Sequence, residues 1–221
     1  MLGRRKLMNL VEKHALLPDQ IDSDSIGMVT ANLLEQGWED NDNLFVASRI
    51  VRAEGDFAIA PQIRFSSQAV RSGLQALLNK KTVVTDVRMV QVGISESLLK
   101  LVGVETICKI NTTEVAERAI LEKTTRSISN IRELKTYLDD SIICVGNAPT
   151  ALLEVVDLVR SKAIHPALVI GVPVGFVACS ESKDELLKTD VEFITIEGNR
   201  GGSSAAAATM NALMLLALKK D

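Results

Sequence analysis

Two arginines lie three residues apart near the expected end of a helix. In the stretch SRIVRAEGDF, residues 48–57, Arg49 and Arg52 precede Gly55. Residues three apart share one face of a helix, where like charges repel by roughly a few tenths of a kcal/mol. The whole chain has a formal net charge of −3, so a general excess of cations does not explain the pair. The spacing fits either a solvated pair of side chains or a site for an anion.

A second candidate lies in the stretch GNAPTALLE, residues 146–154. Gly146 allows the backbone to approach a ligand closely, and Pro149 suits the first turn of a helix because it has no N–H to leave unpaired. The free N–H groups of such a turn point outward and favour an anion. The same residues also fit a simple strand-to-helix turn that binds nothing.

The stretch EGNRGGSSAAAATMNAL, residues 197–213, is a glycine-rich loop before an alanine-rich helix. Gly201, Gly202 and Ser203 would place N–H groups at the start of that helix, which is the geometry of an anion cradle. The loop lacks the GK[ST] of a Walker motif, and its glycine spacing differs from a dinucleotide fingerprint. A flexible turn before a closely packed helix remains the alternative.

The stretch GVPVGFVACSESKDE, residues 171–185, is interrupted by Pro173 and Gly175 but is otherwise apolar at its start. A loop this hydrophobic is not explained by solvation alone. It is expected to line a pocket or an interface.

Short apolar runs of strand length dominate the chain after Lys80, and helical patterns separate them. This alternation predicts right-handed crossovers and a parallel sheet covered by helices. We expect an α/β protein with a three-layer α/β/α, flavodoxin-like fold, a five-stranded mainly parallel sheet and an N-terminal helical segment. Residues 1–221 form one domain in this prediction, with residues 1–20 as a helical extension. The five predicted strands are TVVTDV, ETICKI, SIICVG, ALVIGV and VEFITI.

Composition narrows the classes of function. The chain has 47% hydrophobic and 24% charged residues, and 3% aromatic residues, so its core is built from aliphatic side chains. The sequence has no basic block that would predict nucleic-acid binding, and it has no apolar run long enough to predict a membrane span. Three widely spaced cysteines, Cys108, Cys144 and Cys179, are expected to be reduced core residues of a cytoplasmic protein.

The two histidines are poor candidates for catalysis by position. His165 precedes Pro166 at the start of the expected fourth strand, at the edge opposite the expected site, and His14 lies near the N-terminus. No cluster of histidine with cysteine or carboxylate side chains predicts a metal site.

Several long motifs, in the correct order, resemble the precorrin-8X methylmutase family, also called cobalt-precorrin-8 methylmutase or precorrin isomerase. They are GNAPTAL, PALVIGVPVGFV, ESKD and GNRGGSSAAAA, with DVRMVQVGI and TRS between residues 86 and 127. The resemblance runs from about Ile21 to the C-terminus, roughly nine-tenths of the chain. It implies a homodimer with sites near the subunit interface, and no cofactor, any cobalt being part of the substrate.

The implied reaction moves a methyl group between adjacent ring carbons of a carboxylated tetrapyrrole in cobalamin (vitamin B12) biosynthesis. Precorrin-8X or cobalt-precorrin-8 would give hydrogenobyrinate or cobyrinate. By resemblance, Ser25, Arg49 and Arg126 contact the substrate. The same expectation extends to the loop residues Gly146, Asn147, Thr150, Pro173, Gly175, Gly201, Gly202 and Ser203.

One position departs from the family. The family has a histidine three residues after the first arginine as its proton donor and acceptor, and this chain has Arg52 there. Arginine, whose pKa lies far above neutral pH, stays protonated and is a good partner for a carboxylate rather than an acid. A corrinoid-binding or carrier protein with impaired catalysis is therefore an alternative function. A flavodoxin-like protein that binds another phosphate or a nucleotide is a third.

Overall fold

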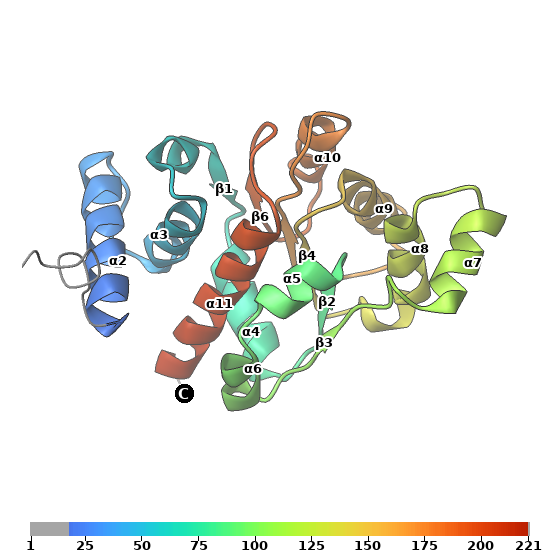
Figure 1. Ribbon diagram of the computed structural model, residues 1–221, viewed down its shortest axis with the longest axis horizontal. Coiled ribbons are helices and arrows are strands. Elements are labelled where there is room, and N and C mark those ends of the chain that lie inside the picture. The colour runs from blue at the N-terminus through green and yellow to red at the C-terminus, as the bar shows by residue number, and fades with distance from the viewer. Residues whose placement is uncertain (1–17, 221) are drawn as a thin grey trace, which may run out of the picture.

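The chain folds around one sheet with helices on both faces in the computed structural model, which describes residues 18–220 (Figure 1). The elements in chain order are α2 (Pro18–Glu35), α3 (Asp42–Glu54), the 3-10 helix η1 (Phe57–Gln62), β1 (Ile63–Phe65), α4 (Ala69–Leu78), β2 (Val83–Thr85), α5 (Arg88–Gly93), α6 (Glu96–Val102), β3 (Thr106–Ile107), α7 (Thr113–Leu121), α8 (Arg126–Glu133), the 3-10 helix η2 (Lys135–Tyr137), β4 (Ile142–Val145), α9 (Pro149–Arg160), β5 (Leu168–Gly171), α10 (Cys179–Leu186), β6 (Phe193–Ile196) and α11 (Ser203–Lys220).

The strand order across the sheet is β1-β6-β5-β4-β2-β3, and β2 to β6 are mutually parallel. Each of the five predicted strands contains one of these parallel strands. Counted in chain order, the parallel strands lie in the order 2-1-3-4-5, which is that of flavodoxin-like doubly wound sheets. The predicted α/β/α fold class is confirmed.

The predicted number of strands is wrong by one. A sixth strand, β1, pairs antiparallel with β6 at the edge of the sheet, with Arg64 opposite Thr195. The strand has three residues with a charged one in the middle, so it leaves no alternating apolar pattern in the sequence. Its register comes from β6, a segment more than a hundred residues away in the chain.

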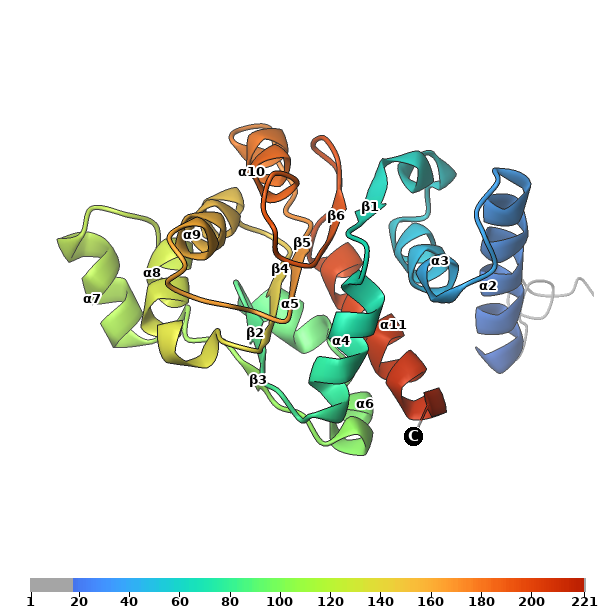
Figure 2. The ribbon, with the colours of Figure 1, turned by 180° about the vertical axis from the view of Figure 1, so that it is seen from behind.

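Alternate residues of the strands face two hydrophobic cores. In β4, Ile142 and Cys144 pack on the side of α11, and Ile143 and Val145 pack on the side of α9. All four side chains are fully buried, as expected for a parallel sheet covered on both faces. The two helical layers are seen in Figures 1 and 2, with α3, α4 and α11 on one face and α8, α9 and α10 on the other.

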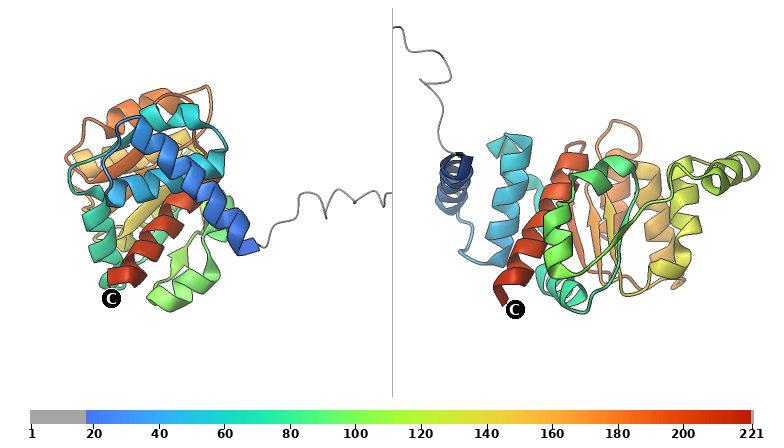
Figure 3. Two further views of the ribbon diagram at one scale, coloured as in Figure 1. Left: turned by 90° about the vertical axis from the view of Figure 1, so that its left-hand side faces the viewer. Right: turned by 60° about the horizontal axis from the view of Figure 1, so that its bottom comes forward.

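Helix α3 ends before Gly55, where the sequence predicts the end of a helix. The side chain of Asn41 caps its start by accepting hydrogen bonds from the backbone N–H groups of Asn43 and Leu44, and Gly55 ends it with a φ of 64°. Outside α3 lies α2, the outermost helix on that side of the molecule (Figure 3). His14 and most of the predicted 1–20 extension lie outside the described residues.

Candidate functional site

The carboxyl ends of β2, β4, β5 and β6 bring together the loops that carry most of the predicted site residues. In a doubly wound sheet this edge is where ligands bind. Helix α3 reaches the same edge, because Glu54 at its end contacts the start of α11.

The two arginines of α3 share one carboxylate. Asp22 of α2 accepts contacts from Arg52, with 2.6 Å between Nη2 and Oδ1, and from Arg49, with 3.5 Å between Nη1 and Oδ2. The guanidinium of Arg49 also lies over the ring of Phe45, 5.2 Å from its centre, and its buried Nε has no hydrogen-bond partner within residues 18–220. Ser25, one helical turn after Asp22, is half-buried on the same helix. Among residues 18–220, the ion pairs of these two arginines therefore share a single carboxylate.

The turn after β4 is already occupied by a side chain of the protein. Asp86, which follows β2, accepts hydrogen bonds from the backbone N–H groups of Gly146, Asn147 and Ala148 at 3.1, 2.9 and 2.8 Å. Burial raises the pKa of Asp86, while these backbone hydrogen bonds act in the opposite direction. The anion expected at this turn is thus supplied from within the chain. A ligand could still reach the exposed side chain of Asn147 and the half-buried Thr150.

Helices α8 and α9 begin side by side. The hydroxyls of Thr125, which caps α8, and Thr150 are 3.1 Å apart. Asn130 of α8 donates to the backbone carbonyl of Thr85 at 3.0 Å and accepts from the N–H of Lys109 at 2.7 Å, which fixes α8 against the end of β2. Arg126, the first residue of α8, is exposed beside this junction.

The glycine-rich loop after β6 crosses directly over the loop after β5. The N–H of Gly202 donates to the carbonyl of Val172 at 2.8 Å, and a Cβ on Gly201 would lie 2.5 Å from the same oxygen. Both glycines have φ values above 130°, which L residues with side chains rarely adopt. Ser203 then starts α11, and its buried hydroxyl has no hydrogen-bond partner in the described part of the chain.

A buried lysine of α10 forms hydrogen bonds to the glycine-rich loop after β6. Lys183 of α10 is fully buried, and its Nζ donates to the carbonyls of Gly198 at 2.9 Å and Arg200 at 2.5 Å. Cys179 lies beside it, with its Sγ 3.2 Å from the carbonyl of Pro173. Burial lowers the pKa of Lys183 and raises that of Cys179. These two side chains connect both loops of the site to α10.

The loop after β5 presents apolar side chains outward. Phe176 is 92% exposed and Val177 is 84% exposed, while Pro173 is buried and Gly175 has a φ of 150°. Met89 of α5 is also exposed. Between α5 and the start of α11 lies a groove of about 410 Å³. Its lining residues are Met89, Gly93, Ser203, Ser204, Ala207, Ala208 and Asn211.

The predicted site residues fall into separate groups. Ser25, Arg49 and Arg52 lie together on α2 and α3, and the residues of the three loops lie together at the centre of the edge. Arg126 is on α8, at the other end of the molecule from α2 (Figure 1). Asp86 and Lys183 were missed because neither residue stands in a recognisable spacing with its partners.

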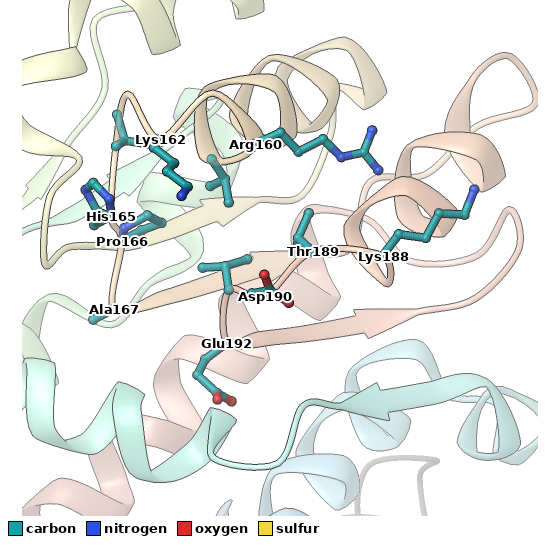
Figure 4. A pocket seen from close by; sticks show the side chains of 12 residues that line it. Arg160, Lys162, His165, Pro166, Ala167, Lys188, Thr189, Asp190 and Glu192 are labelled. Carbon is teal, nitrogen blue, oxygen red and sulfur yellow. The ribbon is translucent and has the colours of Figure 1, made fainter.

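A separate pocket of about 620 Å³ lies at the opposite edge of the sheet (Figure 4). It is formed before β5 and β6, with His165, Ala167 and Glu192 among its lining residues. None of the predicted site residues lies there. The position of His165 at this amino edge agrees with the prediction.

Within residues 18–220, no three side chains of His, Cys, Asp or Glu come together as a possible metal site. In the same part of the chain, no helix has the length and apolar character needed to cross a membrane. Cys144 and Cys179 are buried, Cys108 is partly buried, and all three are free.

Comparison with known proteins gives a consistent result. The family model for precorrin-8X methylmutase matches residues 20–216. The cobalt-precorrin-8 methylmutase of Leptospira interrogans is 40% identical over 194 residues, which cover 84% of this chain and 86% of that protein. The enzyme of the same name from Priestia megaterium is 38% identical over 200 residues, covering 90% and 88%. The crystal structure of precorrin-8X methylmutase from Thermus thermophilus superposes with a TM-score of 0.80 at 34% identity, covering 91% of this chain and 98% of that one.

Proposed function

Because this chain belongs to the precorrin-8X methylmutase family, we propose that it is an isomerase of cobalamin biosynthesis. It moves a methyl group between adjacent ring carbons of precorrin-8X or cobalt-precorrin-8. The observation that supports this most strongly is the pair of arginines, which share a single carboxylate within residues 18–220, at the same edge of the sheet as exposed apolar side chains. A carboxylated macrocycle needs both.

In this proposal the side chains have distinct tasks. Arg49 and Arg52 bind a peripheral carboxylate, with Ser25 nearby as a further donor, and Arg126 binds another carboxylate. Phe176 and Val177 pack against the apolar ring. Thr150, Asn147 and the loop of Gly201, Gly202 and Ser203 line the centre of the site.

The proposal also includes the oligomeric state, the cellular location and the cofactor requirement of the protein. The protein works as a homodimer in the cytoplasm, without a cofactor of its own, and cobalt belongs to the substrate. The exposed Val92 of α5 and Leu101 of α6 support a dimer, because large apolar side chains at the surface commonly mark a contact.

The proton transfer is the step for which Arg52 is unsuited. Migration of a methyl group requires that a proton be added to the ring and another removed, and the two balance in an isomerisation. Loss of a general acid typically lowers a rate by about 10²–10⁴, whereas enzymes commonly reach accelerations of ~10⁶ or more. Binding and orientation of the substrate therefore leave room for measurable turnover.

The direct test is to incubate the purified protein with precorrin-8X and with cobalt-precorrin-8 and to follow the visible spectrum. We expect conversion above the uncatalysed background. The variant Arg52→His supplies a group that titrates near neutral pH, and we expect it to turn over at least as fast as the unchanged protein. A variant that reacts beside an unchanged protein that does not would contradict the proposal.

That last outcome would favour the second candidate function, a corrinoid-binding or carrier protein. The pairing of Arg52 with a carboxylate, Asp22, favours it, because an arginine binds anions but stays protonated where the family resemblance implies a proton donor. Such a protein binds hydrogenobyrinate or cobyrinate tightly without turnover, which a spectral titration measures. Failure to bind either product would exclude this candidate too.

Substitution of Asp22 tests whether the arginines serve a substrate carboxylate. We expect Asp22→Asn to tighten binding of the carboxylated product by about three- to tenfold, because Asp22 competes for both guanidinium groups. Stability should change by less than about 1 kcal/mol, since the ion pairs are partly exposed. Titration of the product at low and high salt measures the effect.

The matched control is Asp24→Asn on the same helix, because Asp24 is exposed and lies outside the ion pairs found among residues 18–220. It should leave the affinity unchanged. Weaker binding by Asp22→Asn would mean that Asp22 orients the arginines instead of competing for them.

A further inference from the structure

We propose that Glu54 is the acid that protonates the substrate in this protein. The inference rests on the proposed function, and it assigns the proton transfer that Arg52 cannot carry out. Glu54 would donate the proton of its carboxyl group to the ring and recover one from the ring position that loses a proton. The isomerisation then consumes no proton overall and needs no further reactant.

The position of Glu54 places it at the central part of the site. It is the last residue of α3, and its Oε1 accepts a hydrogen bond of 2.7 Å from the hydroxyl of Ser204. Ser204 lines the groove of about 410 Å³ between α5 and α11, next to Ser203 with its unpartnered buried hydroxyl. Glu54 therefore lies at the junction of the arginine-bearing helix, the glycine-rich loop and the apolar groove.

Each of the neighbouring carboxylates forms an ion pair with an arginine. Asp56 pairs through Oδ2 with Arg200 at 2.7 Å and accepts through Oδ1 from the N–H of Ala58 at 2.8 Å. Asp22 is held by the two arginines of α3, and Glu197 pairs with Arg64. Protonation of any of these would break an ion pair.

Glu54 differs from all of them. Among the ion pairs formed by residues 18–220, none involves Glu54, so no Lys, Arg or His nitrogen of that part of the chain lies within 4.0 Å of its carboxylate. Its one hydrogen-bond donor there is a neutral hydroxyl. The side chain is half-buried, and its hydrogen-bond partner Ser204 lines the groove. Asp86, which also forms no ion pair within residues 18–220, is buried and holds the turn after β4 through three backbone N–H groups, so its protonation would disturb that turn. Glu54 has no such structural task.

The charged groups around Glu54 come from three elements. Arg52 lies two residues earlier on α3, Arg200 lies on the glycine-rich loop in its pair with Asp56, and Asp22 faces α3 from α2. The contact from α11 is the hydroxyl of Ser204. The arginines bind the substrate's anions in this arrangement, and Glu54 supplies the proton.

The experiment compares Glu54→Gln with Asp56→Asn in steady-state assays on precorrin-8X across pH. Glu54→Gln keeps the shape of the side chain and its acceptor oxygen for Ser204 but has no proton to give. We expect kcat to fall by about 10²–10⁴ with KM changed by less than about threefold. The descending limb of the pH profile, which reports the acid, should disappear. Asp56→Asn should lower kcat by less than tenfold and keep that limb.

Restoring activity with a second substitution distinguishes a role of Glu54 in proton transfer from a purely structural role. Adding Arg52→His to Glu54→Gln restores a titrating group nearby, and we expect it to recover activity together with a new pH limb near the pKa of histidine. Binding of cobyrinate and the circular dichroism spectrum of each variant establish that it is folded.

Two failures are distinguishable. If the unchanged protein turns over and Glu54→Gln matches it in kcat and pH profile, Glu54 is not the acid and the proposed function stands. If the unchanged protein fails to convert either substrate, both the proposed function and the role of Glu54 are overturned.

Discussion

The variant Asp86→Asn is expected to lower the free energy of unfolding by about 2–4 kcal/mol. The two carboxylate oxygens of Asp86 accept three backbone N–H groups, with Oδ1 bound to Gly146 and Oδ2 bound to Asn147 and Ala148. Asparagine keeps one acceptor oxygen and puts an NH₂ group in place of the other. At least one N–H then faces a donor in a buried site, and the charge that suits the start of α9 is lost.

Urea unfolding followed by circular dichroism measures this effect, provided that the slope of the transition is the same for both proteins. Asp157→Asn is the matched control, because Asp157 is an exposed residue of α9. It should change stability by less than about 0.5 kcal/mol. Equal stability of Asp86→Asn and the unchanged protein would show that the three hydrogen bonds do not hold the turn.

Gly201→Ala is expected to cost about 2–5 kcal/mol, the sum of backbone strain and a steric clash. Gly201 has a φ of 131°, and a Cβ there would lie 2.5 Å from the carbonyl oxygen of Val172. That oxygen is backbone and also accepts the hydrogen bond from Gly202, so it cannot move aside without opening the contact between the two loops. We expect the variant to lose affinity for the product as well as stability.

The control for this variant is Gly198→Ala in the same loop. Gly198 also has a positive φ, 75°, but a Cβ there would meet nothing within 4 Å. Its cost should be limited to the left-handed conformation, roughly 1–2 kcal/mol. Thermal unfolding of both variants, together with product titration, separates the clash from the conformational cost. A loss as small in Gly201→Ala as in Gly198→Ala would contradict the close approach of the loops.

The parallel strands were predictable because each is a short run of aliphatic or β-branched residues buried on both faces, such as Ile142–Val145. The edge strand β1 was not, since three residues with Arg64 at the centre carry no periodic signal. The end of α3 was predictable from Gly55, because a glycine in the left-handed conformation is a local property of the chain.

The site was only partly predictable, because several of its contacts join residues that are far apart in the chain. The sequence indicated that Arg49 and Arg52 could face an anion, and the structure supplies one, Asp22, from another helix. It also indicated an anion at Gly146–Ala148, but the partner is Asp86, 60 to 62 residues earlier in the chain. Pairings of this kind depend on which strands become neighbours, and no local spacing records that.

The rate at which Lys183 reacts with an acylating reagent can report how often the loops of the site open. Amine-modifying reagents act on neutral, accessible lysines, and this amine is enclosed by the carbonyls of Gly198 and Arg200 and by Cys179. Acylation of Lys183 therefore requires that the loops over α10 first separate. Mass spectrometry of the peptide that carries Lys183, sampled over time with and without bound product, would give the opening rate of the loops directly. The exposed Lys100 on α6 reacts without such a delay and serves as the internal standard for the reagent.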